Sequence, residues 1–183
     1  WLRDAKALYM VIDGQNFSRW AGTLPQTPIL WEPNQPYMVS NNASEFQRLV
    51  GRAKIVSPNL AEARQIYGNL AAESLVTALL RDGAEIAVVR MGHYGSLVGA
   101  KSMKSIARIP AVQVEVTDIT GAGNAYNGGF LAGWMKTGDP VQAARYGTVS
   151  ASFCVESIGI FDPHQPDAEA KRDERLAWLE KQT

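Results

Sequence analysis

The sequence predicts an α/β fold with a doubly wound, mainly parallel sheet and flanking helices. Two observations support this fold class. Short apolar runs with strand character alternate with longer segments of helical spacing, and Gly and Pro residues separate them. The length of 183 residues suits one domain, and no repeat or linker divides the chain. We therefore expect a single domain over residues 1–183, in which residues 168–181 form a C-terminal helix.

The expected elements alternate along the chain. Apolar runs predict strands at residues 7–12, 28–31, 54–56, 85–90, 96–99 and 112–116. Helical spacing predicts helices at residues 44–52, 60–67, 73–81, 123–136, 140–156 and 168–181. Residues 18–27 and 31–42 are expected to be long loops. Ser44 and Asp139 are the expected N-caps of two helices, and Pro140 suits a first helical position.

Composition indicates an intracellular enzyme without a polyanionic partner. Lys+Arg and Asp+Glu both number 18, so we expect no nucleic-acid partner and no membrane partner. The single cysteine, Cys154, excludes an internal disulfide and fits the reducing environment of the cytoplasm. It lies among apolar residues, which favours a buried, unreactive thiol. Trp134 and Met135 are likewise expected in the core.

The most informative segment is Asp-Ile-Thr-Gly-Ala-Gly-Asn at residues 118–124. A strand-like run leads into it and a helix-like run leads out, an arrangement that forms an anion site. The dinucleotide fingerprint is excluded because Tyr126 stands where its third glycine belongs. Gly123 and Gly128 have the spacing of a P-loop, but that motif is excluded because Gly129-Phe130 stands where its Lys-Ser/Thr belongs. The remaining alternative is a plain turn with Thr120 as N-cap.

Asn59 and Glu62 lie three residues apart at an expected helix start, so their side chains share one face. Their oxygen atoms suit Mg²⁺, which keeps several of its waters when a protein binds it. The same pair also forms a capping box. Both roles stay open from the residues alone.

Four segments in the same order resemble the ribokinase/PfkB family of carbohydrate kinases. Residues 118–124 resemble its Asp-Thr-Thr-Gly-Ala-Gly-Asp signature, and residues 57–63 resemble its Asn-x-x-Glu motif. Residues 89–98 resemble its nucleotide loop, and residues 150–159 resemble the segment that closes over adenine. The resemblance covers roughly residues 5–163. The terminal Asn124, with residues 29–33, most resembles a fungal and plant subgroup that includes the fungal maintenance-of-killer proteins.

The resemblance implies phosphoryl transfer from Mg-ATP to a sugar or similar small alcohol. It implies an anion hole at Gly121, Ala122 and Gly123, with Asn124 at the position of the family's base. The implied metal residues are Asn59 and Glu62 for hydrated Mg²⁺, and Asp118 and Thr120 for a monovalent cation such as K⁺. The implied nucleotide-binding residues are Gly92, Gly95, Val155, Ile158 and Gly159.

Asn124 keeps two function classes open, because an amide has no basic site at neutral pH. The first is a kinase whose chemistry is weakened, and the second is a degenerate nucleotide-binding relative that acts through partners. A third option, which does not depend on Asn124, is a folded fragment without activity because its sugar-binding portion is absent. Arg90 either reaches a phosphate or forms a surface ion pair. Close packing of one helix on the sheet would explain Gly128-Gly129.

The resemblance begins part-way into the usual kinase, because the chain starts at Trp1. We therefore expect the family's first strands and lid to be missing here. A parallel sheet cut in its middle leaves an apolar edge, which favours self-association, so a homo-oligomer is a candidate state.

Overall fold

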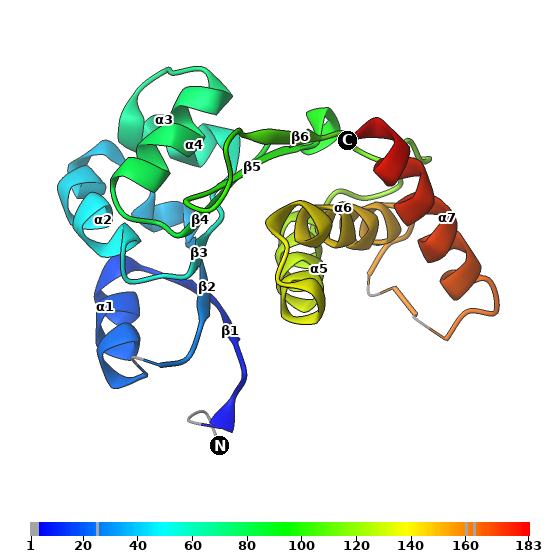
Figure 1. Ribbon diagram of the computed structural model, residues 1–183, viewed down its shortest axis with the longest axis horizontal. Coiled ribbons are helices and arrows are strands. Elements are labelled where there is room, and N and C mark those ends of the chain that lie inside the picture. Colours follow the sequence, from blue (N-terminus) through cyan, green and yellow to red (C-terminus); the bar gives the residue numbers. More distant parts are fainter. Residues whose placement is uncertain (1–3, 25, 160, 163) are drawn as a thin grey trace. The chain divides into compact units, whose positions relative to one another are not determined.

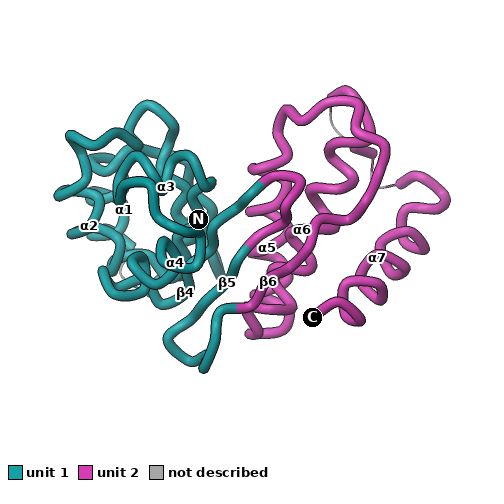
Figure 2. Tube along the Cα trace, turned by 90° about the horizontal axis from the view of Figure 1, so that it is seen from above, with its two compact units in different colours: residues 1–91, 97–106 teal, residues 92–96, 107–183 magenta. Residues whose placement is uncertain are grey.

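The computed structural model describes residues 4–24, 26–159, 161–162 and 164–183, and these fall into two compact units (Figure 2). The first unit contains residues 1–91 and 97–106, and the second contains residues 92–96 and 107–183. No helix in the described part of the chain is both long enough and apolar enough to cross a membrane.

The first unit is a parallel sheet with helices. Its strands are neighbours in the order β1 (Leu8–Ile12), β2 (Ile29–Pro33), β3 (Ile55–Val56), β4 (Ile86–Arg90) and β5 (Ser96–Ala100). The strands β1 to β4 pair in parallel. Its helices lie on one side of these strands and are α1 (Gly14–Thr23), α2 (Ala43–Val50), α3 (Leu60–Tyr67) and α4 (Ala72–Arg81) (Figure 1). The predicted α/β class with a mainly parallel sheet is confirmed.

Helix α1 corrects the expectation of a loop at residues 18–27. The Asp13 side chain caps this helix by accepting a hydrogen bond from the Asn16 backbone N–H at 2.8 Å. Phe17 and Ala21, one turn apart, are buried, and the Phe17 ring stacks on Trp31 at 4.0 Å. These contacts offset the low helix propensity of the glycines in α1, so tertiary packing decides the structure here.

Helix α2 corrects the prediction of Ser44 as an N-cap. Phe46, Leu49 and Val50 are buried as their spacing predicts. The helix begins one residue earlier than Ser44, its N-cap is Asn42, and no side-chain hydrogen bond caps it. A short 3₁₀ turn at Ser40–Asn42 leads directly into α2 and takes the place of a side-chain cap.

The second unit is mainly helical. It contains the short strand β6 (Ala107–Ile109), α5 (Ala122–Thr137), α6 (Pro140–Val155) and α7 (Ala168–Gln182). The strand predicted at residues 112–116 is wrong, because the backbone there is irregular and Val116 is 58% exposed. Pro110 follows β6 directly and lacks the N–H that a strand pairing needs. The Asp139 side chain caps α6 as predicted, accepting from the Val141 N–H at 2.8 Å.

Close packing of α5 on α6 explains one glycine of the Gly128-Gly129 pair. A Cβ atom on Gly129 would lie 2.6 Å from the Ser150 Cβ and 2.8 Å from the Tyr146 carbonyl oxygen. A Cβ atom on Gly128 would meet no atom of the other described residues within 4 Å, the nearby backbone of α5 itself apart. The partner of this helix is therefore α6, rather than the sheet as we expected. Met135 is 42% exposed, so its predicted place in the core is wrong.

Candidate functional site

The turn before α5 is built from backbone and one carboxylate. Gly121 is the N-cap of α5, and its φ of 83° is left-handed, a conformation that favours glycine. Asp118 accepts a hydrogen bond from the Thr120 N–H at 2.9 Å, and this bond lowers the pKa of Asp118. Asp118 therefore has the role of closing the turn. The alternative with Thr120 as N-cap is wrong, because Gly121 holds that position.

The chemistry of this helix start fits an anion. Side chains cap α1, α3 and α6, whereas no side-chain hydrogen bond caps α2, α4, α5 or α7 in the described residues. Of the four helices without such a cap, α2, α4 and α7 each carry a glutamate in the first turn. The first turn of α5 carries no acidic residue. The positive end of the helix dipole thus meets no competing negative charge within that turn. Ala122, Gly123 and Asn124 form this first turn, and Asn124 is exposed.

A hollow of about 530 Å³ opens beside the turn in the second unit. It is lined by Thr120, Gly121, Ala125, Gly129, Ala132, Tyr146, Val149, Ser150, Phe153, Cys154, Gly159, Phe161 and Arg172. Of the three residues predicted to contact adenine, Gly159 lines this hollow, as do Thr120 and Gly121 of the anion turn. Val155 and Ile158 are not among its lining residues, and Ile158 is 81% exposed.

The carboxyl end of α6 is tied to the anion turn. The Thr117 N–H donates to the Val155 carbonyl oxygen at 2.8 Å, and the Asp118 N–H donates to the same oxygen at 3.2 Å. The Cys154 thiol donates to the Thr120 carbonyl oxygen at 3.4 Å. Burial, together with the charge of Asp118, raises the pKa of Cys154, which keeps the group a thiol at neutral pH. Cys154 is half-buried, so its expected full burial is wrong, and its lack of reactivity stays a prediction.

The nucleotide-loop glycines Gly92 and Gly95 flank a 3₁₀ turn at Gly92–Tyr94. Both have positive φ angles, of 59° and 83°. A Cβ atom on Gly95 would lie 2.0 Å from the Ile109 carbonyl oxygen, so a close backbone approach requires glycine there. Apart from Gly92 itself and its chain neighbours, no atom of the described residues lies within 4 Å of the corresponding point at Gly92. Their contact with a nucleotide stays a prediction.

In the first unit, Asn59 and Glu62 form the capping box that their spacing predicts. The Glu62 N–H donates to Asn59 Oδ1 at 2.9 Å, and the Asn59 N–H donates to Glu62 Oε2 at 2.8 Å. The capping role is therefore confirmed. Burial raises the pKa of Glu62, while the Asn59 hydrogen bond and the Arg90 charge lower it. A role in orienting Mg²⁺ stays a prediction.

Beside Glu62 lies a buried ion pair that the sequence did not indicate. Arg90 Nη2 lies 2.6 Å from Glu32 Oε1, 3.0 Å from the Ser57 carbonyl oxygen and 3.9 Å from Glu62 Oε2. The Arg90 and Glu32 side chains are each 10% exposed, so the expected surface ion pair is wrong. Glu32 and Arg90 lie near the carboxyl ends of β2 and β4, and α3 begins just after β3. This edge of a parallel sheet is where such folds bind ligands, and that rule could have indicated the pair.

The donor set in the first unit fits a hydrated cation better than a fully coordinated one. No group of three or more His, Cys, Asp or Glu side chains able to hold a metal ion occurs in the described part of the chain. Asn59 and Glu62 offer oxygen atoms, the ligands Mg²⁺ prefers, and Mg²⁺ is commonly held by one or two carboxylates and its own waters.

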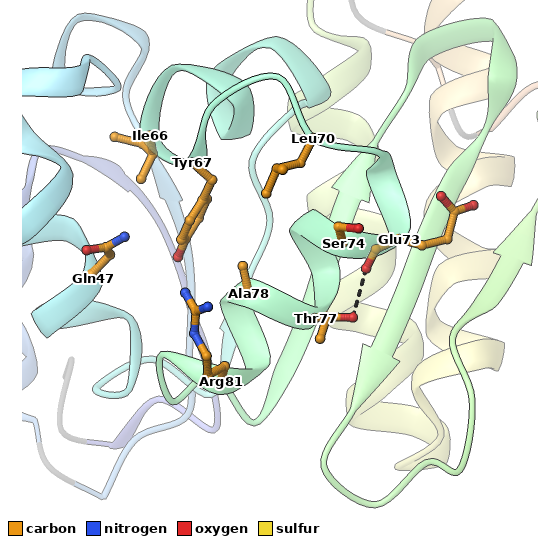
Figure 3. A pocket seen from close by; sticks show the side chains of 9 residues that line it. All are labelled: Gln47, Ile66, Tyr67, Leu70, Glu73, Ser74, Thr77, Ala78 and Arg81. Atoms are coloured by element: carbon orange, nitrogen blue, oxygen red, sulfur yellow. Dashed lines mark hydrogen bonds between the residues drawn. The ribbon is translucent and has the colours of Figure 1, made fainter.

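A second hollow, of about 540 Å³, lies among α2, α3 and α4 in the first unit (Figure 3). It is lined by Gln47, Ile66, Tyr67, Leu70, Glu73, Ser74, Thr77, Ala78 and Arg81. The Thr77 hydroxyl donates to the Glu73 carbonyl oxygen at 2.9 Å, and the Tyr67 hydroxyl donates to Asp82. None of the predicted site residues lines it. Its polar groups serve local helix contacts, so we assign it no chemistry.

Comparison with known proteins decides the family. The model of the pfkB family carbohydrate kinases matches residues 26–167. The chain belongs to the pfkB family. It is 28% identical over 134 residues to an uncharacterized sugar kinase of Archaeoglobus fulgidus, which covers 72% of this chain and 51% of that protein. It is 35% identical over 114 residues to the cytidine kinase of Thermococcus kodakarensis, which covers 62% of this chain and 41% of that protein.

The pfkB chain also matches solved structures. Arabidopsis thaliana ribokinase, complexed with ribose and ATP, has a TM-score of 0.76 and 20% identity over 96% of this chain and 57% of that one. This likeness establishes the ribokinase-like fold. The chain spans about half the length of the curated relatives it matches.

Proposed function

We propose that this protein transfers a phosphoryl group from ATP to a sugar or similar small alcohol, and that Asn124 weakens the chemical step. The observation that carries the proposal is the start of α5, where a left-handed Gly121 opens a helix whose first turn has neither an acidic residue nor a side-chain cap. Phosphoryl transfer depends mostly on positioning and on stabilising charge, and a bare helix start supplies both.

The chain's own groups would take separate roles. Bound Mg-ATP supplies the transferable phosphoryl group and positive charge beside it. The backbone N–H groups of Ala122, Gly123 and Asn124 would hold phosphate oxygens, and Gly159 would border the nucleotide together with Gly92 and Gly95. Residues Asn59 and Glu62 would orient hydrated Mg²⁺, whereas Asp118 and Thr120 would offer oxygens to a monovalent cation such as K⁺.

Asn124 limits the proton transfer. Its amide can hydrogen-bond a substrate hydroxyl but cannot take the proton from it at neutral pH. A general base is typically worth ~10²–10⁴ in rate. This residue is also the observation that favours a second candidate function, a catalytically degenerate nucleotide-binding protein that acts through partners.

The subgroup, the location and the assembly are parts of the same proposal. Asn124, the last residue of the motif at residues 118–124, supports the resemblance to the fungal and plant subgroup that includes the maintenance-of-killer proteins. The single cysteine and the balanced charge support a cytoplasmic protein. A homo-oligomer is proposed because, within the described part of the chain, β1 has one neighbour in the sheet, β2, and Val11 on β1 is 44% exposed. Light scattering that gives a stable monomer would contradict this last point.

Calorimetry with Mg-ATP tests the nucleotide site. We expect the natural protein to bind Mg-ATP at or below roughly millimolar nucleotide. The Gly123→Asp substitution places a carboxylate in the first turn of α5, so we expect it to abolish this binding. The matched control is Gly128→Asp, the same chemical change in the same helix, where open space receives the side chain. It should leave binding unchanged. A folded natural protein that gives no heat with Mg-ATP would contradict the proposal.

A further inference from the structure

The strongest observation outside the phosphate turn is the arrangement of charges around Arg90. Two buried carboxylates, Glu32 and Glu62, approach one guanidinium, and all three side chains are 10–11% exposed. The charges sum to minus one. Tyr9 donates its hydroxyl hydrogen to Glu32, so this carboxylate is held from two directions.

Arg90 is fixed by backbone as well as by charge. The backbone N–H of Arg90 donates to the Pro58 carbonyl oxygen at 3.1 Å, and the side-chain Nη2 donates to the Ser57 carbonyl oxygen at 3.0 Å. These residues lead directly into α3, whose first turn carries Glu62. Arg90 thus joins the carboxyl end of β4 to the segment that presents Glu62, and the ion pair with Glu32 joins it to β2.

The guanidinium is not saturated by these contacts. Its Nε atom is buried and has no hydrogen-bond partner in the described residues. Glu62 Oε2 lies 3.9 Å from Nη2, too long for a hydrogen bond but close enough for attraction. The Glu62 carboxylate meanwhile keeps its hydrogen bond to Asn59. The positive charge of Arg90 therefore restrains the Glu62 carboxylate. The carboxylate oxygens of Glu62 remain available to a further partner.

We propose that Arg90, braced by Glu32, is a positioning residue that fixes the Glu62 carboxylate for a hydrated Mg²⁺. The inference rests on the proposed function, because Glu62 takes its Mg²⁺ role from there. Removal of a group that orients a metal-binding side chain typically lowers metal affinity by about 10–100-fold. The part of ATP affinity that depends on Mg²⁺ should fall by this factor when the brace is lost.

The test compares ATP affinity measured in Mg²⁺ with ATP affinity measured in EDTA, by calorimetry on the full natural protein. The ratio of the two isolates the Mg²⁺ contribution. The main variant is the double substitution Glu32→Gln with Arg90→Met, which removes the brace while the cluster keeps its charge of minus one. We expect its affinity in EDTA to match that of the natural protein and the Mg²⁺ ratio to fall by about 10–100-fold.

Two further variants complete the design. Arg81→Met is the matched control, because the Arg81 side chain is 69% exposed at the end of α4, where it pairs at 3.1 Å with Asp82, which is 13% exposed. Its ratio should equal that of the natural protein. Arg90→Lys keeps the charge but loses the planar fork, so its ratio should lie between the natural and double-variant ratios. If the double variant does not fold, Arg90→Lys carries the test.

The outcomes separate the two proposals. A double variant, or Arg90→Lys in its place, with an unchanged Mg²⁺ ratio would overturn the role of Arg90 while leaving the proposed function intact. Equal losses of affinity in Mg²⁺ and in EDTA would also overturn it, because they would indicate general disruption. A natural protein that binds no ATP under either condition would overturn the proposed function and this inference together.

Discussion

The two candidate phosphate-transfer regions are built by opposite means. In the first unit, the groups around Glu62 are buried side chains that pair with one another and with backbone. In the second unit, the turn before α5 relies on backbone N–H groups, a left-handed glycine and an absence of charge in the first helical turn. Substitutions in the first region should therefore lower the free energy of unfolding as well as ligand binding. Substitutions in the second region should weaken binding and leave the protein folded.

The sharpest test of this contrast is Arg90→Met. The substitution leaves Glu32 and Glu62 buried without their counter-charge, so we expect a loss of about 3–5 kcal/mol in the free energy of unfolding. Urea denaturation measures it. Arg81→Met, which removes a guanidinium on a side chain that is 69% exposed, should cost within about 1 kcal/mol. Equal effects of the two substitutions would remove the distinction between a buried and an exposed arginine.

A smaller effect is expected where α5 packs on α6. Gly129→Ala forces a methyl group to within 2.6 Å of Ser150 in the absence of adjustment, which should cost about 1–3 kcal/mol. Gly128→Ala, in open space one residue earlier, should instead stabilise the protein by roughly 0.5–1 kcal/mol, because Ala favours a helix. Thermal unfolding of both variants checks the difference. Stabilisation by both substitutions would mean that the two helices can shift apart freely, and destabilisation by both would contradict the open space at Gly128.

The smallest expected effect is a pH dependence from Glu62. Because burial raises its folded-state pKa above the ordinary value of 4.5, the folded protein holds this proton more tightly than the unfolded chain. The resulting stability is present below pH about 4.5 and is lost as the pH rises through the folded pKa. Glu62→Gln keeps a capping-box residue and removes the titration. The stability difference between the natural protein and this variant should therefore change between acidic and neutral pH.

That experiment has a clear failure. Urea unfolding at several pH values from acid to neutral, with both proteins side by side, gives the difference directly. A difference that does not change with pH, or one that favours the natural protein more as the pH rises, would mean that Arg90 and Asn59 outweigh burial at Glu62.

Local patterns predicted much of the fold. The apolar runs at β1, β2 and β4 and the glycine that ends α3 made their elements evident. The pattern failed at α1, where Gly14 and Gly22 hide a helix whose Phe17 and Ala21 face the core. It failed again at residues 112–116, where alternating apolar residues found no strand partner. Periodicity reports which faces could be buried, whereas pairing depends on neighbours distant in sequence.

The candidate site divides in the same way. The capping box at Asn59 and Glu62 was predictable because its partners are three residues apart. The Glu32–Arg90 pair was missed because 58 residues separate its members, and only the alignment of parallel strands brings them together. The anion turn was predicted from its glycines, yet its anchor is the end of α6 at Val155 rather than a preceding strand.

The central claim is that Asn124 slows phosphoryl transfer at the turn before α5. The direct measurement is turnover of Mg-ATP with a panel of sugars and nucleosides by the natural protein, Asn124→Asp and Asn124→Ala. The account predicts slow or undetectable turnover by the natural protein, a gain of about 10²–10⁴ with Asn124→Asp on the right alcohol, and no gain with Asn124→Ala. A natural protein that turns over at about 1–100 s⁻¹, and that Asn124→Asp slows, would contradict it.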